Sequence, residues 1–383
     1  MGKFKGLLLL ILPLMLTGCW DSVELNERHV ILEIAIDKTP KPDLSKPINE
    51  RQIYQITYGI PDIGKLSGKD SLAENVKTSL TTQSPSIATS IDEIETKTQN
   101  TVTFSHTKAL ILGEEMLKDK DAFQAAIDAL LRDMRIGRSV IVLATKGLAG
   151  DLTQADNPQN PIMGMYIMKY FNNKERPVSY AKGQLLANLI KELEDTGVST
   201  MPMIMSDKEG IIQISGAALI KDYAFVTWLD KNEVRGQLLV EGKIKHVPIV
   251  VTYKDHYLTY MIKDQKSKIH FKENNGKLEA NIDLTVKGDI IEYLSSNNKN
   301  IFNEESITEI TQQLKQEIIR QTNLVIDKSQ SLGVDFLGIG LEMYRKDPKQ
   351  WKNYKDTWNE GDYKDFPIHV DTTVNIQNTG ILE

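Results

Sequence analysis

The stretch from 275 to 286 constrains the fold of this chain more tightly than any other. Asn275 and Gly276 suit a two-residue type I′ turn, because both central residues of that turn need positive φ. After the turn, apolar residues alternate strictly with polar ones, which is typical of a strand with one buried face. The apolar residues of this alternation are Leu278, Ala280, Ile282, Leu284 and Val286. The sequence therefore predicts an antiparallel hairpin in a half-buried sheet.

A long amphipathic helix is predicted after this hairpin, over 303–332, because apolar residues recur there at helical spacing. Ser306 and Glu309 form a candidate capping box, and Gly333 supplies a stop. At 1.5 Å per residue the helix would reach roughly 40 Å, enough to cross a whole sheet. Alternation over 368–376 then predicts a final strand.

The N-terminal half alternates strand patterns with helix patterns, which favours an α/β or α+β domain. Strands are predicted over 30–37, 52–60, 102–112 and 139–144, and helices over 70–81, 86–98, 121–134 and 184–195. The first two strands are expected to pair. A loop is expected over 196–207 and taken as a domain boundary, because it holds Gly197, Ser199 and Pro202. Beyond it, strand pairs are predicted over 211–220 with 223–229 and over 249–253 with 256–262, around a helix over 232–240.

The N-terminus has the features of a bacterial export signal that ends in a lipid attachment site. Lys3 and Lys5 precede an apolar run over 6–16, which is too short to span a bilayer as a helix. The letters LTGC at 16–19 look like a lipobox, in which the cysteine receives a diacylglycerol and becomes the mature N-terminus. Cys19 is the single cysteine of the chain, which leaves no disulfide and no thiolate metal site. The alternative is an ordinary secretory signal in which Cys19 is incidental.

Length and composition bound the architecture and the partners. A chain of 383 residues favours two or three domains. We expect an α+β fold with mixed and antiparallel sheets covered by helices, in three domains behind a lipidated N-terminus. The expected division is a signal peptide over 1–18, a tether over 19–29, an N-terminal α/β domain over 30–200, a small middle α+β domain over 206–262 and a C-terminal α+β domain over 263–383. A net charge of −6 without long single-sign blocks, together with export, argues against a nucleic-acid partner.

The sequence shows no coherent catalytic motif. Ser105 and Lys108 match the SxxK spacing, as do Ser179 and Lys182, but the companion Lys-Thr-Gly motif is absent. Ser105 also falls in a predicted strand, where this spacing would not bring the lysine beside the serine. The histidines lack zinc spacing and helical pairing: they are His29, His106, His246, His256, His270 and His369. We therefore expect no enzyme activity and no metal or other cofactor beyond the lipid on Cys19.

An aromatic series follows the predicted start of the last helix, where Asp347 and Pro348 suit the N-cap and first helical positions. Trp351, Tyr354 and Trp358 fall at i, i+3 and i+7, so their rings would share one face. A ligand-stacking or membrane-interface surface is one interpretation. Core packing is favoured over it, because an amphipathic helix normally buries such a stripe.

Three stretches together resemble one family. The first is GCWDSVELN over 18–26, which includes Cys19, Trp20, Asp21, Glu24 and Asn26. The second is TFSHTKALILGEEM over 103–116, and the third is the tail over 347–380 with its Trp351, Trp358 and Phe366-Pro367. In this order they resemble the Ger(x)C family, the lipoprotein C subunits of nutrient germinant receptors in endospore-forming bacteria. The resemblance spans essentially the whole chain.

The resemblance implies a function that the periodicity does not show. It implies a three-domain α+β architecture, and it implies that the lipidated cysteine anchors the protein to the outer face of the spore inner membrane. Family members act with a membrane-embedded A subunit and a multi-spanning, transporter-like B subunit, and the complex starts germination in response to nutrients. Only Cys19 carries over as a functional residue, as the acylation site. The resemblance leaves open what Trp20, Asp21, Glu24 and Asn26 do, and whether this subunit contacts the nutrient.

Two other classes share part of this pattern. A solute-binding lipoprotein of an uptake system would have the lipobox and export, but such proteins usually have two parallel α/β lobes, whereas the C-terminal half here is rich in hairpins. An exported cell-wall hydrolase or transpeptidase would need an active site that the sequence does not show. The favoured function is a non-enzymatic, lipid-anchored subunit of a germinant receptor.

Overall fold

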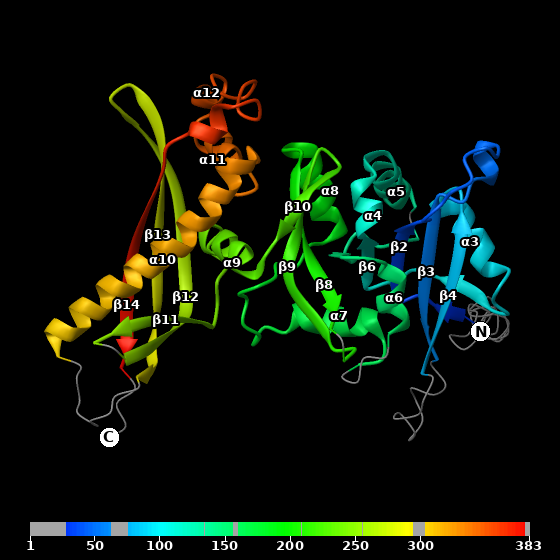
Figure 1. Ribbon diagram of the computed structural model, residues 1–383, viewed down its shortest axis with the longest axis horizontal. Coiled ribbons are helices and arrows are strands. Elements are labelled where there is room, and N and C mark those ends of the chain that lie inside the picture. The colour runs from blue at the N-terminus through cyan, green and yellow to red at the C-terminus, as the bar shows by residue number, and fades with distance from the viewer. Residues whose placement is uncertain are drawn as a thin grey trace, which may run out of the picture.

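The computed structural model describes residues 28–62, 76–133, 135–155, 160–207, 209–254, 256–293 and 303–379. They form an N-terminal body (28–229) and a C-terminal body (247–379), which lie side by side along the long axis with α9 (Lys231–Val240) between them (Figure 1). Several predicted features lie outside the described residues: the signal peptide over 1–18 and the residues Cys19, Trp20, Asp21, Glu24 and Asn26.

An eight-stranded mixed sheet forms the centre of the N-terminal body. In spatial order its strands are β10 (Ala224–Leu229), β9 (Ile212–Lys221), β8 (Val198–Ser206), β7 (Ile141–Thr145), β6 (Ala109–Gly113), β2 (Glu33–Lys38), β3 (Tyr54–Pro61) and β4 (Lys77–Ser84). Neighbours from β8 to β2 run parallel, and the outer pairs run antiparallel, including the predicted pair of β2 with β3. A separate parallel pair joins β1 (Arg28–Val30) to β5 (Thr101–Thr103).

Helices cover both faces of this sheet, which explains why its central strands are continuous apolar runs. Leu110 and Leu112 of β6 face one layer, whereas Ala109 and Ile111 face the other. The first layer contains α3 (Ile87–Glu95), α4 (Glu114–Lys118), α5 (Lys120–Arg132) and α8 (Leu186–Asp195). The second layer contains α6 (Ala149–Gln154) and α7 (Met163–Asn172). The predicted α+β class, with helices on mixed sheets, is confirmed.

Two buried carboxylates of β2 fix the helices of the second layer. Asp37 accepts hydrogen bonds from the backbone N–H groups of Ala149 (2.7 Å) and Gly150 (2.9 Å), at the start of α6. Glu33 accepts one from the backbone N–H of Gly164 at 3.0 Å, in the first turn of α7. Burial raises the pKa of Glu33 to about 7, because this hydrogen bond and the charge of Lys77 do not offset the loss of hydration.

The C-terminal body is a four-stranded sheet with a long helix across one face (Figure 1). Its elements are β11 (Val247–Tyr253), β12 (His256–Asn274), β13 (Lys277–Tyr293), α10 (Glu304–Leu332), α11 (Ile339–Lys346), α12 (Pro348–Trp351) and β14 (Ile368–Asn378), with short 3₁₀ turns at Asp362–Asp365 here and Ile48–Glu50 in the other body. The predicted hairpin is confirmed, because Asn275 and Gly276 have φ of 50° and 75° between paired strands. Gly333 ends α10 in the left-handed conformation, as predicted.

Helix α9 joins the two bodies through one continuous apolar cluster. Val234 and Leu238 pack in a core that contains Leu219 of β9 as well as Val325 of α10. Gly236 allows the close approach of α9 to α10, because a Cβ there would lie 2.8 Å from the backbone oxygen of Gln321 and from Val325. The two bodies are therefore joined by close side-chain packing around α9.

Two predicted elements are corrected by the tertiary structure. The helix expected over 70–81 is contradicted in its described part, because 77–81 belongs to β4, where Thr-rich alternation suits pairing with β3. The loop expected over 196–207 is instead β8, a strand buried on both faces for most of its length. Pro202 is tolerated there because the pairing with β9 shifts register between Pro202 and Ile204.

The sheets do not divide at the predicted domain boundaries of 206 and 262. Strands β8 and β9 form a pair on either side of 206, and β12 runs without a break across 262. Hydrogen bonding therefore groups 212–229 with the N-terminal body and 247–262 with the C-terminal body. The reason is that a hairpin continues its own sheet, and that the residues that suggested a boundary, Gly197, Ser199 and Pro202, lie directly before or within β8.

Two local predictions at the C-terminal body also change. The capping box of α10 uses Asn303 and Ser306, while Glu309 accepts a hydrogen bond from the Tyr253 hydroxyl at 2.9 Å. The last helix is shorter than expected, since α12 ends at Trp351. Core packing of the aromatic series is confirmed nonetheless, because Trp358 is only 3% exposed and the partly buried Trp351 and Tyr354 pack against the same apolar cluster.

Candidate functional site

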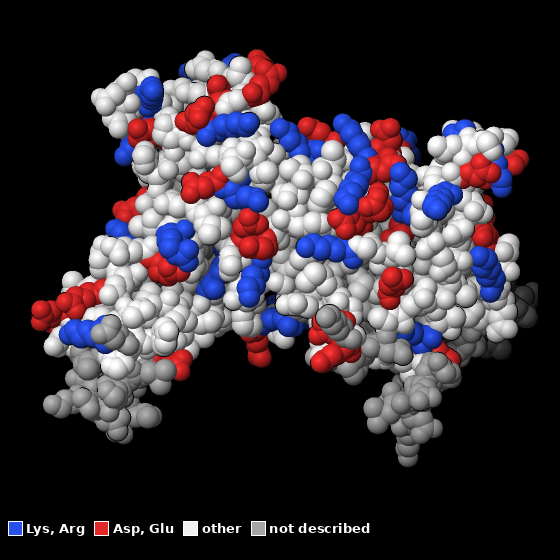
Figure 2. Space-filling view, viewed as in Figure 1, with Lys and Arg blue, Asp and Glu red and all other residues white. Residues whose placement is uncertain are grey.

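A cleft of about 1100 Å³ lies between the two bodies. Helix α8 forms one wall, and α11 with the segment through Asn359 forms the other. The C-terminal end of α9 and residues 267–269 of β12 lie between the walls. Figure 1 shows α8 and the α11–α12 region on the two sides of α9, and Figure 2 shows both signs of charge intermingled over this side of the molecule.

The α8 wall presents a polar helical face to the cleft. The residues of this face follow i, i+3, i+4 and i+7 spacing: Asn188, Lys191, Glu192 and Asp195. The opposite face of α8 is apolar and buried against the sheet through Leu186, Leu189, Ile190 and Leu193. Packing of that apolar face thus fixes which residues reach the cleft.

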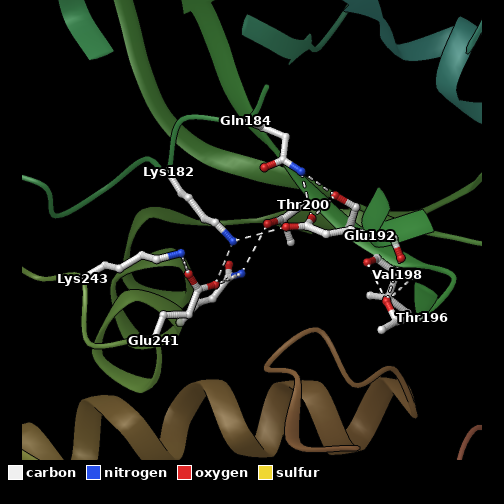
Figure 3. Close-up of polar contacts among 10 residues, drawn as sticks. Lys182, Gln184, Glu192, Thr196, Val198, Thr200, Glu241 and Lys243 are labelled. Atoms are coloured by element: carbon white, nitrogen blue, oxygen red, sulfur yellow. Dashed lines mark hydrogen bonds and ion pairs between the residues drawn. The ribbon is translucent and has the colours of Figure 1, made fainter. Parts of the chain in front are cut away.

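An ion cluster lies where α8 and α9 meet (Figure 3). The ammonium of Lys182 lies 3.1 Å from Oε1 of Glu241 and 3.8 Å from Oε1 of Glu192. Lys243 approaches the other oxygen of Glu241 at 2.6 Å. Burial alone would lower the pKa of Lys182, but the charges of Glu241 and Glu192 outweigh it and raise that pKa. Burial opposes the charge of Glu241 as well, and Lys182 and Lys243 lower its pKa.

Neutral side chains connect this cluster to the central sheet (Figure 3). Ser199 of β8 donates its hydroxyl to Glu192 at 2.6 Å, and the Gln184 amide donates to the same oxygen at 2.8 Å. The Gln237 amide of α9 donates to Glu241 at 2.9 Å and to the Thr200 hydroxyl at 3.3 Å. Two cations and two carboxylates therefore balance one another, and the cluster ties α8, β8 and α9 together.

The opposite wall is held by a buried carboxylate. Asp335 accepts hydrogen bonds from the backbone N–H groups of Ile339 (3.0 Å) and Gly340 (2.7 Å) and from the Trp358 indole at 3.0 Å. Burial raises the pKa of Asp335 despite these three donors. Gly340 is required by a close approach, because a Cβ would lie 2.7 Å from the Trp358 indole nitrogen and 2.9 Å from the Trp351 ring.

Neither SxxK pair lies in a helix. Lys182 keeps its proton, so it cannot act as a general base for Ser179. Ser105 of the other SxxK pair lies in a turn, because β5 ends at Thr103 and β6 begins at Ala109. The strand predicted over 102–112 is therefore interrupted. The Ser105 hydroxyl oxygen lies 3.2 Å from the Thr103 hydroxyl oxygen.

The histidines do not come together in a metal site. Across the described ranges, no group of three or more His, Cys, Asp or Glu side chains has the geometry to hold a metal ion. Within the same residues, no helix is both long and apolar enough to cross a membrane. Cys19, Trp20, Asp21, Glu24 and Asn26 lie outside the described residues. Lipid attachment at Cys19 therefore stays a prediction, and the role of the other four residues stays open.

Sequence reasoning did not find the cleft. Lys182 drew attention only through its distance from Ser179, whereas its partners Glu192 and Glu241 lie 10 and 59 residues further on. One usable signal was the polar face of the predicted helix over 184–195. That face indicates a solvent-facing surface, but the sequence does not predict that α11 lies opposite it.

Comparison with known families decides the classification. A family model described as "Spore germination protein N-terminal domain" matches residues 21–205, and one described as "Spore germination B3/ GerAC like, C-terminal" matches residues 215–380. The chain belongs to the GerAC family of spore germination proteins. The predicted membership of this group of germinant-receptor C subunits is confirmed.

Individual relatives of this GerAC-family chain match over nearly their full length. Spore germination protein KC of Bacillus subtilis (strain 168) is 24% identical over 98% of this chain and 95% of its own. Spore germination protein B3 of the same organism is 24% identical, over 100% of this chain and 98% of its own. The crystal structure of the GerBC protein superposes with a TM-score of 0.59 at 19% identity, covering 90% of this chain and 97% of that chain. This superposition shows a common fold.

Proposed function

We propose that this GerAC-family chain is a non-enzymatic lipoprotein subunit of a nutrient germinant receptor. A diacylglycerol on Cys19 anchors it to the outer face of the spore inner membrane. There it supports assembly and signalling with the integral-membrane A and B subunits. It uses no cofactor apart from this covalent lipid.

The observation that carries the proposal is that two germination-family models match 21–205 and 215–380, directly behind the lipobox at 16–19. Spore germination proteins KC, B3 and A3 of Bacillus subtilis (strain 168) each match 98% or more of this chain. A solute-binding lipoprotein is less well supported, because β11, β12 and β13 pair antiparallel rather than forming a second parallel lobe.

The anchor has a direct physical consequence for assembly. A two-chain lipid holds a protein stably on a bilayer, whereas one chain gives only marginal binding. Confinement to the membrane surface raises the effective concentration of membrane partners, so modest contacts suffice for a stable complex. Signalling by contact between subunits needs no catalytic residue, in accord with a cleft whose lysine stays protonated.

The test compares Cys19→Ala with the neighbouring control Ser22→Ala in sporulating cells. We expect Cys19→Ala to lose incorporation of an alkyne-palmitate label, to leave the membrane fraction and to recover fewer multi-spanning receptor subunits on detergent co-purification. Ser22→Ala should behave like the unchanged protein. Full membrane attachment and assembly of Cys19→Ala would refute the anchor. Recovery of an ABC permease with the unchanged protein would instead indicate a solute-binding lipoprotein.

A further inference from the structure

The cleft between the bodies has walls of opposite charge. On the α8 side the charged residues are two lysines and three carboxylates: Lys182, Lys191, Glu192, Glu194 and Asp195. On the other side the charged residues are three cations and one half-buried carboxylate: Arg345, Lys346, Lys355 and Glu342. Lys268 of β12 lies between the two walls. Asp335 also borders that side, but it is buried and accepts the three hydrogen bonds described above. With buried Asp335 left out, the α8 wall carries a net charge of −1 and the opposite wall a net charge of +2.

Apolar side chains line the cleft between these charged walls. Val198, Val240, Ile269 and Leu337 are buried beneath its surface. The apolar surface that reaches the cleft comes from Leu341 and Trp351, which are half-buried, and from Tyr344, which is 54% exposed. An apolar strip between charged rims is the arrangement that receives an amphipathic helix, whose apolar stripe lies inward. Exposed tyrosine is also a common anchor at protein interfaces.

The cleft is large enough for a short helix. A helix with its side chains is about 10–12 Å wide and rises 1.5 Å per residue, so two turns occupy roughly 850–1200 Å³. The cleft volume of about 1100 Å³ matches two such turns. Pockets for small molecules are usually about 300–1000 Å³ and enclose most of the ligand.

We propose that this cleft docks an amphipathic helix of a partner protein, with a basic flank against α8 and an acidic flank against the α11–α12 side. The opposite charges of the two walls fix the direction of the helix, because reversing it would place like charges together. The ion cluster around Lys182 keeps the α8 wall in place beneath the partner. This proposal rests on the proposed function only in expecting that the partner is another receptor subunit.

Three synthetic peptides of equal length test the proposal on the purified full-length protein in detergent. All three carry the same leucine stripe; one has a lysine flank and a glutamate flank, one has two lysine flanks and one has two glutamate flanks. Fluorescence anisotropy should show the mixed peptide binding about tenfold more tightly than either of the others. Asn188→Trp, which fills the cleft from α8, should abolish this binding. Equal binding of all three peptides, or none, would overturn the proposal.

Charge reversal separates docking from general damage. In the double variant Glu194→Lys with Asp195→Lys both walls are basic, so preference should move to the peptide with two glutamate flanks. A gain of binding cannot arise from a misfolded protein. The matched control Asp327→Lys, on the outer face of α10, should keep the preference for the mixed peptide. An unchanged preference in the double variant would contradict the proposal.

A photo-crosslinking amino acid at Asn188 tests the proposal in spore membranes, with Asn323 on the outer face of α10 as the control position. Support would be an adduct mapped to an amphipathic helix of another receptor subunit, with its basic flank toward α8. An adduct within the same chain would show that the walls close on each other, and an adduct between two copies would show self-association. Either would overturn the proposal. Failure here or with the peptides, combined with normal co-purification of receptor subunits, would leave the proposed function standing.

Discussion

The ammonium of Lys182 lies 3.1 Å from Oε1 of Glu241, although 59 residues separate them in the sequence. Lys182 precedes α8, and Glu241 directly follows α9, so this contact links the N-terminal body to the helix that joins it to the C-terminal body. The side chains are only 19% and 15% exposed. The stability of the joint should therefore depend on this pair.

Lys182→Met is expected to lower the free energy of unfolding by about 3 kcal/mol, because it leaves Glu241 buried with only Lys243 as a counter-ion. Chemical denaturation monitored by circular dichroism measures the change. Lys191→Met is the matched control, since Lys191 is exposed on the neighbouring helix, and should change stability by less than about 0.5 kcal/mol. A similar small effect for both variants would show that the buried pair contributes nothing.

Asp335→Asn is expected to cost about 2 kcal/mol, because an amide cannot accept all three hydrogen bonds that the carboxylate accepts. Asp335→Ala also removes the acceptor of the Trp358 indole, so in that variant tryptophan fluorescence should shift to longer wavelength below the unfolding transition. Asp356→Asn, at an exposed position of the same segment, should leave both stability and fluorescence unchanged. An unshifted spectrum for Asp335→Ala would disprove the role of Asp335 in fixing the tryptophan.

Stability is expected to fall as pH rises from 4.5 to 7, through the ionisation of Glu33. Its pKa is about 7 in the folded protein and 4.5 ordinarily, so the folded state binds the proton more tightly and is favoured at low pH. The contribution is fully present below pH 4.5 and lost above pH 7, and amounts to about 3 kcal/mol. Comparing Glu33→Gln with the unchanged protein by denaturation at several pH values isolates this contribution.

Glu33→Gln should remove that part of the pH dependence. Glu115→Gln, at an exposed position, should follow the unchanged protein across the same range. The interpretation is wrong if Glu33→Gln and the unchanged protein keep a constant difference in stability from pH 4.5 to 7.

Gly236→Ala is expected to destabilise the protein by about 2 kcal/mol, although alanine is the better helix former by about 1 kcal/mol. The added Cβ would lie 2.8 Å from the Gln321 backbone and from Val325, so α9 and α10 must move apart. Thermal unfolding gives the sign directly. Gly361→Ala is the control, because a Cβ there has no atom within 4 Å. A rise in melting temperature for Gly236→Ala would rule out this close approach.

Features set by neighbouring residues were predictable. The turn at Asn275-Gly276, the stop at Gly333 and the N-cap at Asp347 depend on backbone preferences of one or two residues, and all three occur. Strand β8 was not predictable in the same way, because burial on both faces removes the alternation that marks a strand. Its turn-forming residues Gly197 and Pro202 then favoured a loop.

The periodic elements, the antiparallel hairpin, the long helix and the family resemblance were all readable from the sequence, since each depends on residues close together in the chain or on short motifs. Long-range packing was needed to show that the hairpins continue two sheets and that α9 packs between them. It alone brought Lys182 to Glu241 and placed α8 opposite α11, which creates the cleft. The physical reason is that such contacts join distant segments, and their geometry depends on how whole apolar faces pack rather than on any local preference.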